Sequence, residues 1–206
     1  MYRYFDSGNT SEFEEIAIAV AVLTVSYSIL IFRDYGFHVT SIAFAGFVLG
    51  ESFLASFTAF FLHELAHRQV GRRLGYYTRF KLWPFGIILA FITSFLGFLF
   101  GAMGAVNIYN ARDHPSMGRI AAAGPATNLG LGLIFFSVGF GLSFNPSIAD
   151  IAFSVSTLNF YLGAFNMIPL GPLDGQKVLA WSLRNYVILF APLVLMTVIS
   201  FSLVGI

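Results

Sequence analysis

Three ionisable side chains lie close together after an apolar run in the stretch FFLHELAHRQVGRRLG, residues 60–75. His63 and His67 are four positions apart, so a helix would place both imidazoles on one face, one turn apart. This is the H-E-x-x-H arrangement, in which two histidines bind zinc and the glutamate between them acts as a general base. The pattern therefore predicts one zinc ion per chain, with His63 and His67 as ligands and Glu64 as the base.

A chance match in a buried helix is the alternative interpretation of this stretch. The run of Phe and Leu before it is typical of a membrane span, and ionisable groups inside a span are costly and by default mark a functional site. Three such groups together, without a metal or a partner, would be very unfavourable. The location of the motif therefore favours a metal site over coincidence.

The composition indicates the class of protein. Of the 206 residues, 57% are hydrophobic and only 10% are charged, whereas a soluble domain carries about 25% charged residues. We therefore expect an all-α, multi-pass protein of the cell membrane, with residues 1–206 as a single domain and a zinc-site core at about 45–176. The net charge of +1 indicates no nucleic-acid partner, the absence of cysteine excludes thiolate ligands, and the oligomeric state is not predicted.

The apolar runs predict about five full transmembrane helices, since a helix needs ~20 apolar residues to cross a bilayer. One span begins between Ser41 and Ser52 and ends in the histidine motif. The run at 82–111 is rich in Gly, which suits a re-entrant segment or paired half-helices better than one smooth helix. The remaining spans are predicted at 16–32, 120–142, 151–170 and 187–204.

Basic residues predict the orientation, because loops rich in Lys and Arg stay on the cytoplasmic side. One loop directly after the histidine motif holds five of them: Arg68, Arg72, Arg73, Arg79 and Lys81. This places the N-terminus and the zinc site toward the cytoplasm.

A catalytic zinc site needs a third protein ligand and an open position for water. After His67 the only candidates are Asp113, His114, Asp150 and Asp174. Asp150 begins a span at the opposite face, and Asp113 and His114 lie in a polar loop typical of a surface. Asp174 follows the span at 151–170 on the side of His67, provided that the chain crosses the membrane an even number of times between them. The prediction of Asp174 as a ligand therefore also requires that 82–111 returns to its starting side.

The segment before Asp174 is predicted to unwind. Pro169, Gly171 and Pro172 cannot continue a regular helix, and this would turn Asp174 toward the metal. Asn166 precedes the unwinding point. Its amide either binds a substrate carbonyl or a developing oxyanion, or joins two helices by a hydrogen bond, and the sequence leaves both roles open.

Three motifs in order resemble those of the site-2 proteases, a family of intramembrane zinc metalloproteases. HELAH at 63–67 is similar to the zinc helix of the family, GPATN at 124–128 to its Gly-Pro-x-x-Asn element, and NMIPLGPLDG at 166–175 to its N-x-x-P-x-x-x-L-D-G motif. The chain would be a minimal core form without a PDZ or CBS domain.

The resemblance implies hydrolysis of peptide bonds in or next to transmembrane segments of membrane protein substrates. His63, His67 and Asp174 would bind zinc, Glu64 would be the base, and Asn166 would lie beside the site. The alternative is a metal-binding transporter or sensor without protease activity. A transporter should show ionisable residues along a path across the bilayer, whereas here they gather near one face, with Glu51 as the exception.

Overall fold

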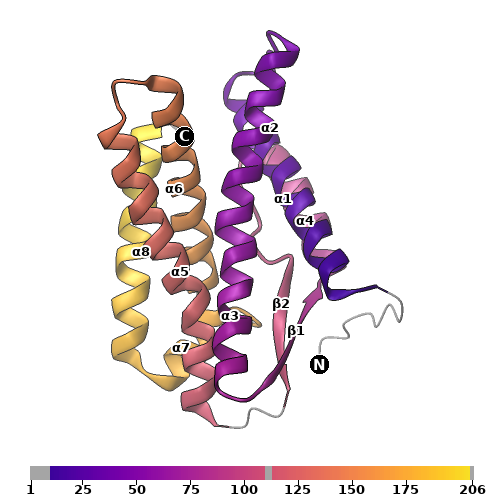
Figure 1. Ribbon diagram of the computed structural model, residues 1–206, viewed down its shortest axis with the longest axis vertical. Coiled ribbons are helices and arrows are strands. Elements are labelled where there is room, and N and C mark those ends of the chain that lie inside the picture. Colours follow the sequence, from indigo (N-terminus) through magenta and orange to yellow (C-terminus); the bar gives the residue numbers. More distant parts are fainter. Residues whose placement is uncertain (1–9, 110–112, 205–206) are drawn as a thin grey trace.

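The computed structural model describes residues 10–109 and 113–204 (Figure 1). In chain order the elements are α1 (Glu12–Asp34), α2 (Ile42–Ser56), the π-helical turn η1 (Phe57–Phe61), α3 (Leu62–Arg73), β1 (Tyr77–Leu82), α4 (Pro84–Leu96), β2 (Gly104–Tyr109), α5 (His114–Gly141), α6 (Pro146–Asn166), α7 (Asp174–Trp181) and α8 (Leu183–Val204).

Five helices of the described ranges are long and apolar enough to cross a membrane, which confirms the predicted all-α, multi-pass class. They are α1, the continuous helix formed by α2, η1 and α3, then α5, α6 and α8. Several of them extend beyond the predicted spans because polar residues cap their ends. At α1, for example, the Ser11 hydroxyl accepts a hydrogen bond from the backbone of Glu14, and the Glu14 carboxylate accepts one from the backbone of Ser11.

The segment between α3 and α5 enters the bundle and returns to the end from which it started. β1 and β2 pair in antiparallel fashion from Tyr77 opposite Tyr109 to Leu82 opposite Gly104. Between them lies α4, which has only 13 residues and ends at Gly97, whose φ of 94° favours glycine. The predicted return is confirmed, but the two strands were not predicted, because their ladder joins residues on either side of a helix.

The outer edge of β1 is covered by the first turn of α1. Glu12 accepts a hydrogen bond from the Phe80 backbone N–H at 2.9 Å, and Glu15 accepts one from the Leu82 N–H at 2.8 Å. The Lys81 ammonium lies 3.6 Å from the Glu15 carboxylate. Two acidic side chains of α1 therefore fill hydrogen-bonding positions that a third strand would occupy.

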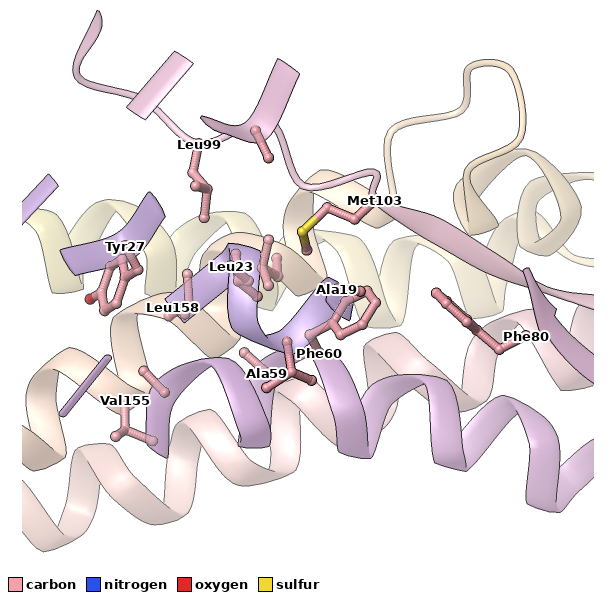
Figure 2. Packing of buried hydrophobic residues seen from close by; sticks show 14 of the residues in the cluster. Ala19, Leu23, Tyr27, Ala59, Phe60, Phe80, Leu99, Met103, Val155 and Leu158 are labelled. Atoms are coloured by element: carbon pink, nitrogen blue, oxygen red, sulfur yellow. The ribbon is translucent and has the colours of Figure 1, made fainter. Parts of the chain in front are cut away.

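The main apolar core lies where α1, η1 and α6 meet the antiparallel pair of β1 and β2, which is called the hairpin below. Figure 2 shows Leu23 of α1, Phe60 of η1 and Leu158 of α6 gathered with residues of the re-entrant segment. A second cluster joins α5, α6, α7 and α8 around Phe160 and Met167. The second cluster joins α5 to α7, and α3, which carries the histidine motif, packs against α5 at the lower end of the view in Figure 1.

Candidate metal centre

Three side chains from two distant parts of the chain converge at this end. His63 and His67 lie one turn apart on α3, and Asp174 is the first residue of α7. The Asp174 Oδ2 atom lies 3.3 Å from His63 Nε2 and 2.9 Å from His67 Nε2, and the two Nε2 atoms are 2.9 Å apart. All three residues are buried. The fold thus brings together the three residues predicted as ligands.

The other nitrogen of each imidazole has a hydrogen-bond acceptor. His67 Nδ1 lies 2.7 Å from the backbone oxygen of Ile120, which can only accept, so Nδ1 carries the proton. His63 Nδ1 faces the side-chain oxygen of Asn128. The Asn128 amide nitrogen donates to the Ala59 backbone oxygen at 2.9 Å, which fixes the orientation of this amide. Both imidazoles therefore direct an unprotonated Nε2 toward the centre.

The converging atoms are all acceptors. Two imidazole lone pairs and one carboxylate oxygen point at one another with no proton between them, an arrangement that is unfavourable unless a cation lies among them. Tetrahedral zinc holds nitrogen and oxygen ligands at about 2.0–2.1 Å, and the 2.9–3.3 Å separations are close to those such a geometry requires. The donor set therefore fits zinc, with the fourth position available for water or substrate.

Glu64 lies next to the three ligands without joining them. Its side chain is buried and accepts a backbone hydrogen bond from Val106 of β2. Its second oxygen, Oε2, is buried and has no hydrogen-bond partner among the described residues. One oxygen is thus fixed by the hairpin, and the other is available to accept a proton.

Asp174 is held as a carboxylate by its surroundings. Burial alone would raise its pKa, but the positive charge of Lys177 is among the influences that outweigh burial and keep the pKa well below its ordinary value. The Lys177 ammonium lies 3.5 Å from Asp174 Oδ1, so it contacts the oxygen that does not face the histidines. The ligand oxygen therefore remains unprotonated and available to a cation.

The close approach of α5 to the site requires glycine at position 124. A Cβ atom built on Gly124 would overlap Nε2 of both His63 and His67. The surface that α5 approaches here is formed by the imidazoles of His63 and His67. Gly175 is constrained in a similar way, since its Cβ would overlap the backbone oxygen of Met167.

An open cavity borders the site. It is lined by Glu64, His67 and Asp174 and by residues of β2. Asn166 also lines this cavity, and its amide nitrogen donates to Leu162 of its own helix at 3.0 Å. The hydrogen bond donated by the amide nitrogen is thus within α6 rather than between helices.

The other ionisable residues considered in the sequence lie elsewhere. Asp113 caps α5, where it accepts from the Ser116 backbone and the Tyr76 hydroxyl at the surface. The side chain of His114 lies outside the described residues. Asp150 and Glu51 line a different cavity, near the ends of α1 and α2 that are remote from the histidines.

Two buried asparagines near the site were not singled out in the sequence. Asn128 was noted only as part of the GPATN motif, and Asn159 was not considered. Both are fully buried, and they hydrogen-bond to each other at 3.1 Å. Their position inside predicted spans was the available signal, because uncompensated polar side chains are costly there.

The chain is similar in sequence to several zinc metalloproteases. It is 35% identical over 188 residues to "Putative zinc metalloprotease MJ0611" of Methanocaldococcus jannaschii, across 89% of this chain and 92% of that protein. It is 35% identical over 120 residues to "Putative zinc metalloprotease Rip3" of Mycobacterium tuberculosis, across 56% of this chain and 26% of that protein. "Zinc metalloprotease MJ0392" of Methanocaldococcus jannaschii is 26% identical over 170 residues, across 75% and 45%.

Neither a protein-family model nor a solved structure matches the chain. The likeness to the first of these relatives nevertheless extends over almost the whole of both proteins. Their names agree with a donor set that fits zinc. The chain therefore belongs to this family and is a zinc metalloprotease.

Proposed function

We propose that this chain is an intramembrane protease of the site-2 type, which hydrolyses peptide bonds in or next to transmembrane segments of membrane proteins. The observation that carries the proposal is the position of the metal centre. His63 and His67 lie on a 32-residue apolar helix, Ile42–Arg73, surrounded by further helices long enough to span a bilayer. A substrate that reaches this site most directly is one that already lies in the membrane.

The residues around the centre supply the parts of a hydrolytic reaction. Bound zinc supplies Lewis acidity and makes water a nucleophile near neutral pH. Glu64 Oε2, which has no partner among the described residues, accepts the proton of the attacking water and passes it to the leaving amine. Lys177 remains paired with Asp174 and balances the charge at the remote side of the ligand.

The hairpin offers a place for an extended substrate. A peptide bond inside a helix is shielded, so the segment to be cut must unwind before water can attack it. β2 lines the cavity, and within the described ranges β1 is its sole paired strand. An unwound segment can pair with the second edge of β2 and so satisfy its backbone groups, close to Glu64.

Asn166 is proposed to bind the carbonyl oxygen of the scissile bond. Its side chain lies at the wall of the cavity that Glu64 and Asp174 also line. An amide donor at this point stabilises the negative charge that develops on the oxygen during attack. Without substrate its nitrogen donates to Leu162, so substrate binding must draw that donor into the cavity.

Cleavage in liposomes tests the proposal. The purified chain and a model single-span substrate are reconstituted together, and mass spectrometry locates the cut, with Glu64→Gln as the inactive control. We expect cuts within the span or a few residues from its end. Cleavage of water-soluble unfolded peptides with the membrane substrate left intact would overturn the proposal.

The proposed orientation places the metal centre toward the cytoplasm. The chain has no cysteine, so single cysteines report sidedness without interference. Arg73→Cys at the end of α3 should react with an impermeant maleimide only from the cytoplasmic face. Ser143→Cys, between α5 and α6, should react only from the opposite face, and the reverse pattern would show that the orientation is wrong.

A further inference from the structure

We propose that Asn159 is a positioning residue of the metal centre. Acting through Asn128, it keeps the proton of His63 on Nδ1 and so leaves Nε2 free to bind zinc. The proposal rests on the metal centre and not on the nature of the substrate.

The two asparagines form a continuous chain of hydrogen bonds. The Asn128 amide nitrogen donates to the Ala59 backbone oxygen at 2.9 Å and to the Asn159 side-chain oxygen at 3.1 Å. The Asn159 amide nitrogen donates to the Thr58 hydroxyl at 3.0 Å and to the Val155 backbone oxygen at 2.8 Å. Both asparagine side chains are fully buried, so water does not compete for these groups.

This chain of hydrogen bonds has a defined direction because it ends on backbone carbonyl groups, which can only accept. The carbonyl of Val155 can only accept, so Asn159 must direct its nitrogen there and its oxygen toward Asn128. That oxygen and the carbonyl of Ala59 are both acceptors, so Asn128 must direct its nitrogen toward them. Its own oxygen is then left facing His63 Nδ1, which must donate.

Loss of this direction would close the site against a cation. If Asn128 turned, its nitrogen would face His63 Nδ1 and favour the tautomer with the proton on Nε2. That proton would point at Asp174 Oδ2, 3.3 Å away, where it could form a hydrogen bond in place of a metal bond. Without Asn159, the Ala59 backbone oxygen is the one remaining acceptor described here for the Asn128 amide nitrogen. The amide can then turn, and the His63 tautomer with its proton on Nε2 becomes accessible.

The hydrogen-bond relay formed by Asn159 and Asn128 is attached to the helix that carries the histidines. Thr58 and Ala59 both belong to η1, where the Leu62 N–H bonds to Phe57 in the wider π-helical pattern. Single π turns inside α-helices occur frequently at functional sites. Here the turn supplies an acceptor to each asparagine directly before His63, so α5 and α6 are both anchored to the start of the zinc-binding segment.

Asn159→Leu tests the relay, because leucine has the same branching at Cγ, although it is larger, and has no hydrogen-bonding group. Ser156→Ala is the matched control: Ser156 lies on the same helix, is fully buried, and its hydroxyl donates to Gly132 rather than toward the site. Zinc Kd is measured by chelator competition on the full purified chain. The tautomer of His63 is read in the zinc-free protein by NMR of ¹⁵N-labelled histidine.

We expect Asn159→Leu to raise the zinc Kd by about 10-fold or more, since outer-shell partners of metal-binding histidines contribute 10–100-fold. The His63 signal should change from the Nδ1–H form to a mixture. Ser156→Ala should leave both readouts unchanged. Asn159→Leu with a wild-type Kd and a pure Nδ1–H signal would overturn the proposal.

Thr58→Val keeps the test decisive if Asn159→Leu fails to fold. It removes one acceptor of Asn159 at nearly constant volume and leaves the bond to Val155. A smaller rise in Kd, about threefold, is expected because one of two neutral hydrogen bonds is lost. An unchanged Kd and tautomer in this variant would also overturn the relay. Both readouts are independent of cleavage, so failure of the proposed protease function would be recognised separately.

Discussion

Both ends of the molecule carry acidic side chains, but among the described residues only one end brings potential metal ligands together. At the end that contains the histidine motif, potential ligand atoms of His63, His67 and Asp174 all lie within 4.8 Å of one another. At the other end, Glu51 and Asp150 line a wide cavity from different helices. Among the described residues, no comparable group of ligand atoms is found there.

The difference shows that convergence of acceptor atoms, rather than the presence of charge in an apolar bundle, identifies the site. At the histidine end every proton on the imidazoles is directed outward, and the lone pairs meet. At the other end the two carboxylates come from different helices, with Glu51 half-buried and Asp150 exposed. Each of the following predictions changes one end and uses the other end, or a neighbouring position, as its control.

Loss of a metal ligand should have the largest effect. Asp174→Asn should reduce zinc content and cleavage to background, because even outer-shell partners contribute about 10–100-fold to metal affinity and a ligand contributes more. Asp150→Asn makes the same chemical change at the opposite end and should leave zinc bound. Metal analysis of both purified variants checks this, and equal zinc loss in the two would contradict the assignment of Asp174.

Glu64→Gln should reduce cleavage by about 10²–10⁴-fold, the usual contribution of a general base. Zinc should stay bound, because Glu64 is not among the converging ligands. Glu51→Gln, on the same continuous helix, should retain activity. Single-turnover cleavage with metal analysis separates the two roles, and loss of zinc in Glu64→Gln would mean that Glu64 acts as a ligand.

Gly124→Ala should weaken zinc binding by about 10-fold or more, at the level of an outer-shell change, and destabilise the fold by about 1–3 kcal/mol through overpacking. The new methyl group would displace both imidazoles. Gly130→Ala is the matched control on α5, since a Cβ there meets nothing within 4 Å. Zinc competition and thermal unfolding measure the two effects, and equal behaviour of both variants would argue against a tight approach of α5.

Glu15→Gln should lower the free energy of unfolding by about 1–3 kcal/mol, the range for a buried charged group that loses its partner. Glu15 is buried and contacts the Leu82 N–H and the Lys81 ammonium. Glu14→Gln is an exposed control that keeps the capping box. Thermal unfolding measures the difference, and equal melting of the two variants would show that α1 does not hold the hairpin through Glu15.

Asp113 should give the smallest effect, visible only in acid. Hydrogen bonds from Ser116 and Tyr76 lower its pKa to about 2. A carboxylate whose pKa is lowered by folding stabilises the fold at pH values above its ordinary pKa of about 3.9. This contribution is lost as the pH falls toward 2. Asp113→Ala should therefore melt below wild type at pH 6 and equal to it near pH 2. A difference that persists in acid would contradict this.

Much of the centre was predictable because the membrane restricts the alternatives. The spacing of His63 and His67 indicated a shared helix face, and the requirement for a ligand on the same side selected Asp174. That choice also required the segment at 82–111 to return. The structure agrees on the return and on the proximity of all three residues.

The supporting contacts were not predictable, for a physical reason. The helices are apolar on nearly all sides, so hydrophobic periodicity does not indicate which face of α5 or α6 meets α3. The hydrogen bond of His63 to Asn128 spans 65 positions, and that of Asn159 to Thr58 spans 101. Such contacts depend on how each helix is rotated about its axis. The two strands were not predicted for a similar reason, because β1 and β2 form by pairing with each other although α4 separates them in the sequence.

The covered edge of β1 also bears on association between copies of the chain. An exposed strand edge is a template on which another chain can add a strand and begin to aggregate. In this sheet Glu12 and Glu15 occupy backbone donors on the outer edge of β1, while residues of β2 line the open cavity beside the candidate metal centre. The edge of β1 is therefore closed to edge-to-edge pairing with a neighbouring copy in a crowded membrane.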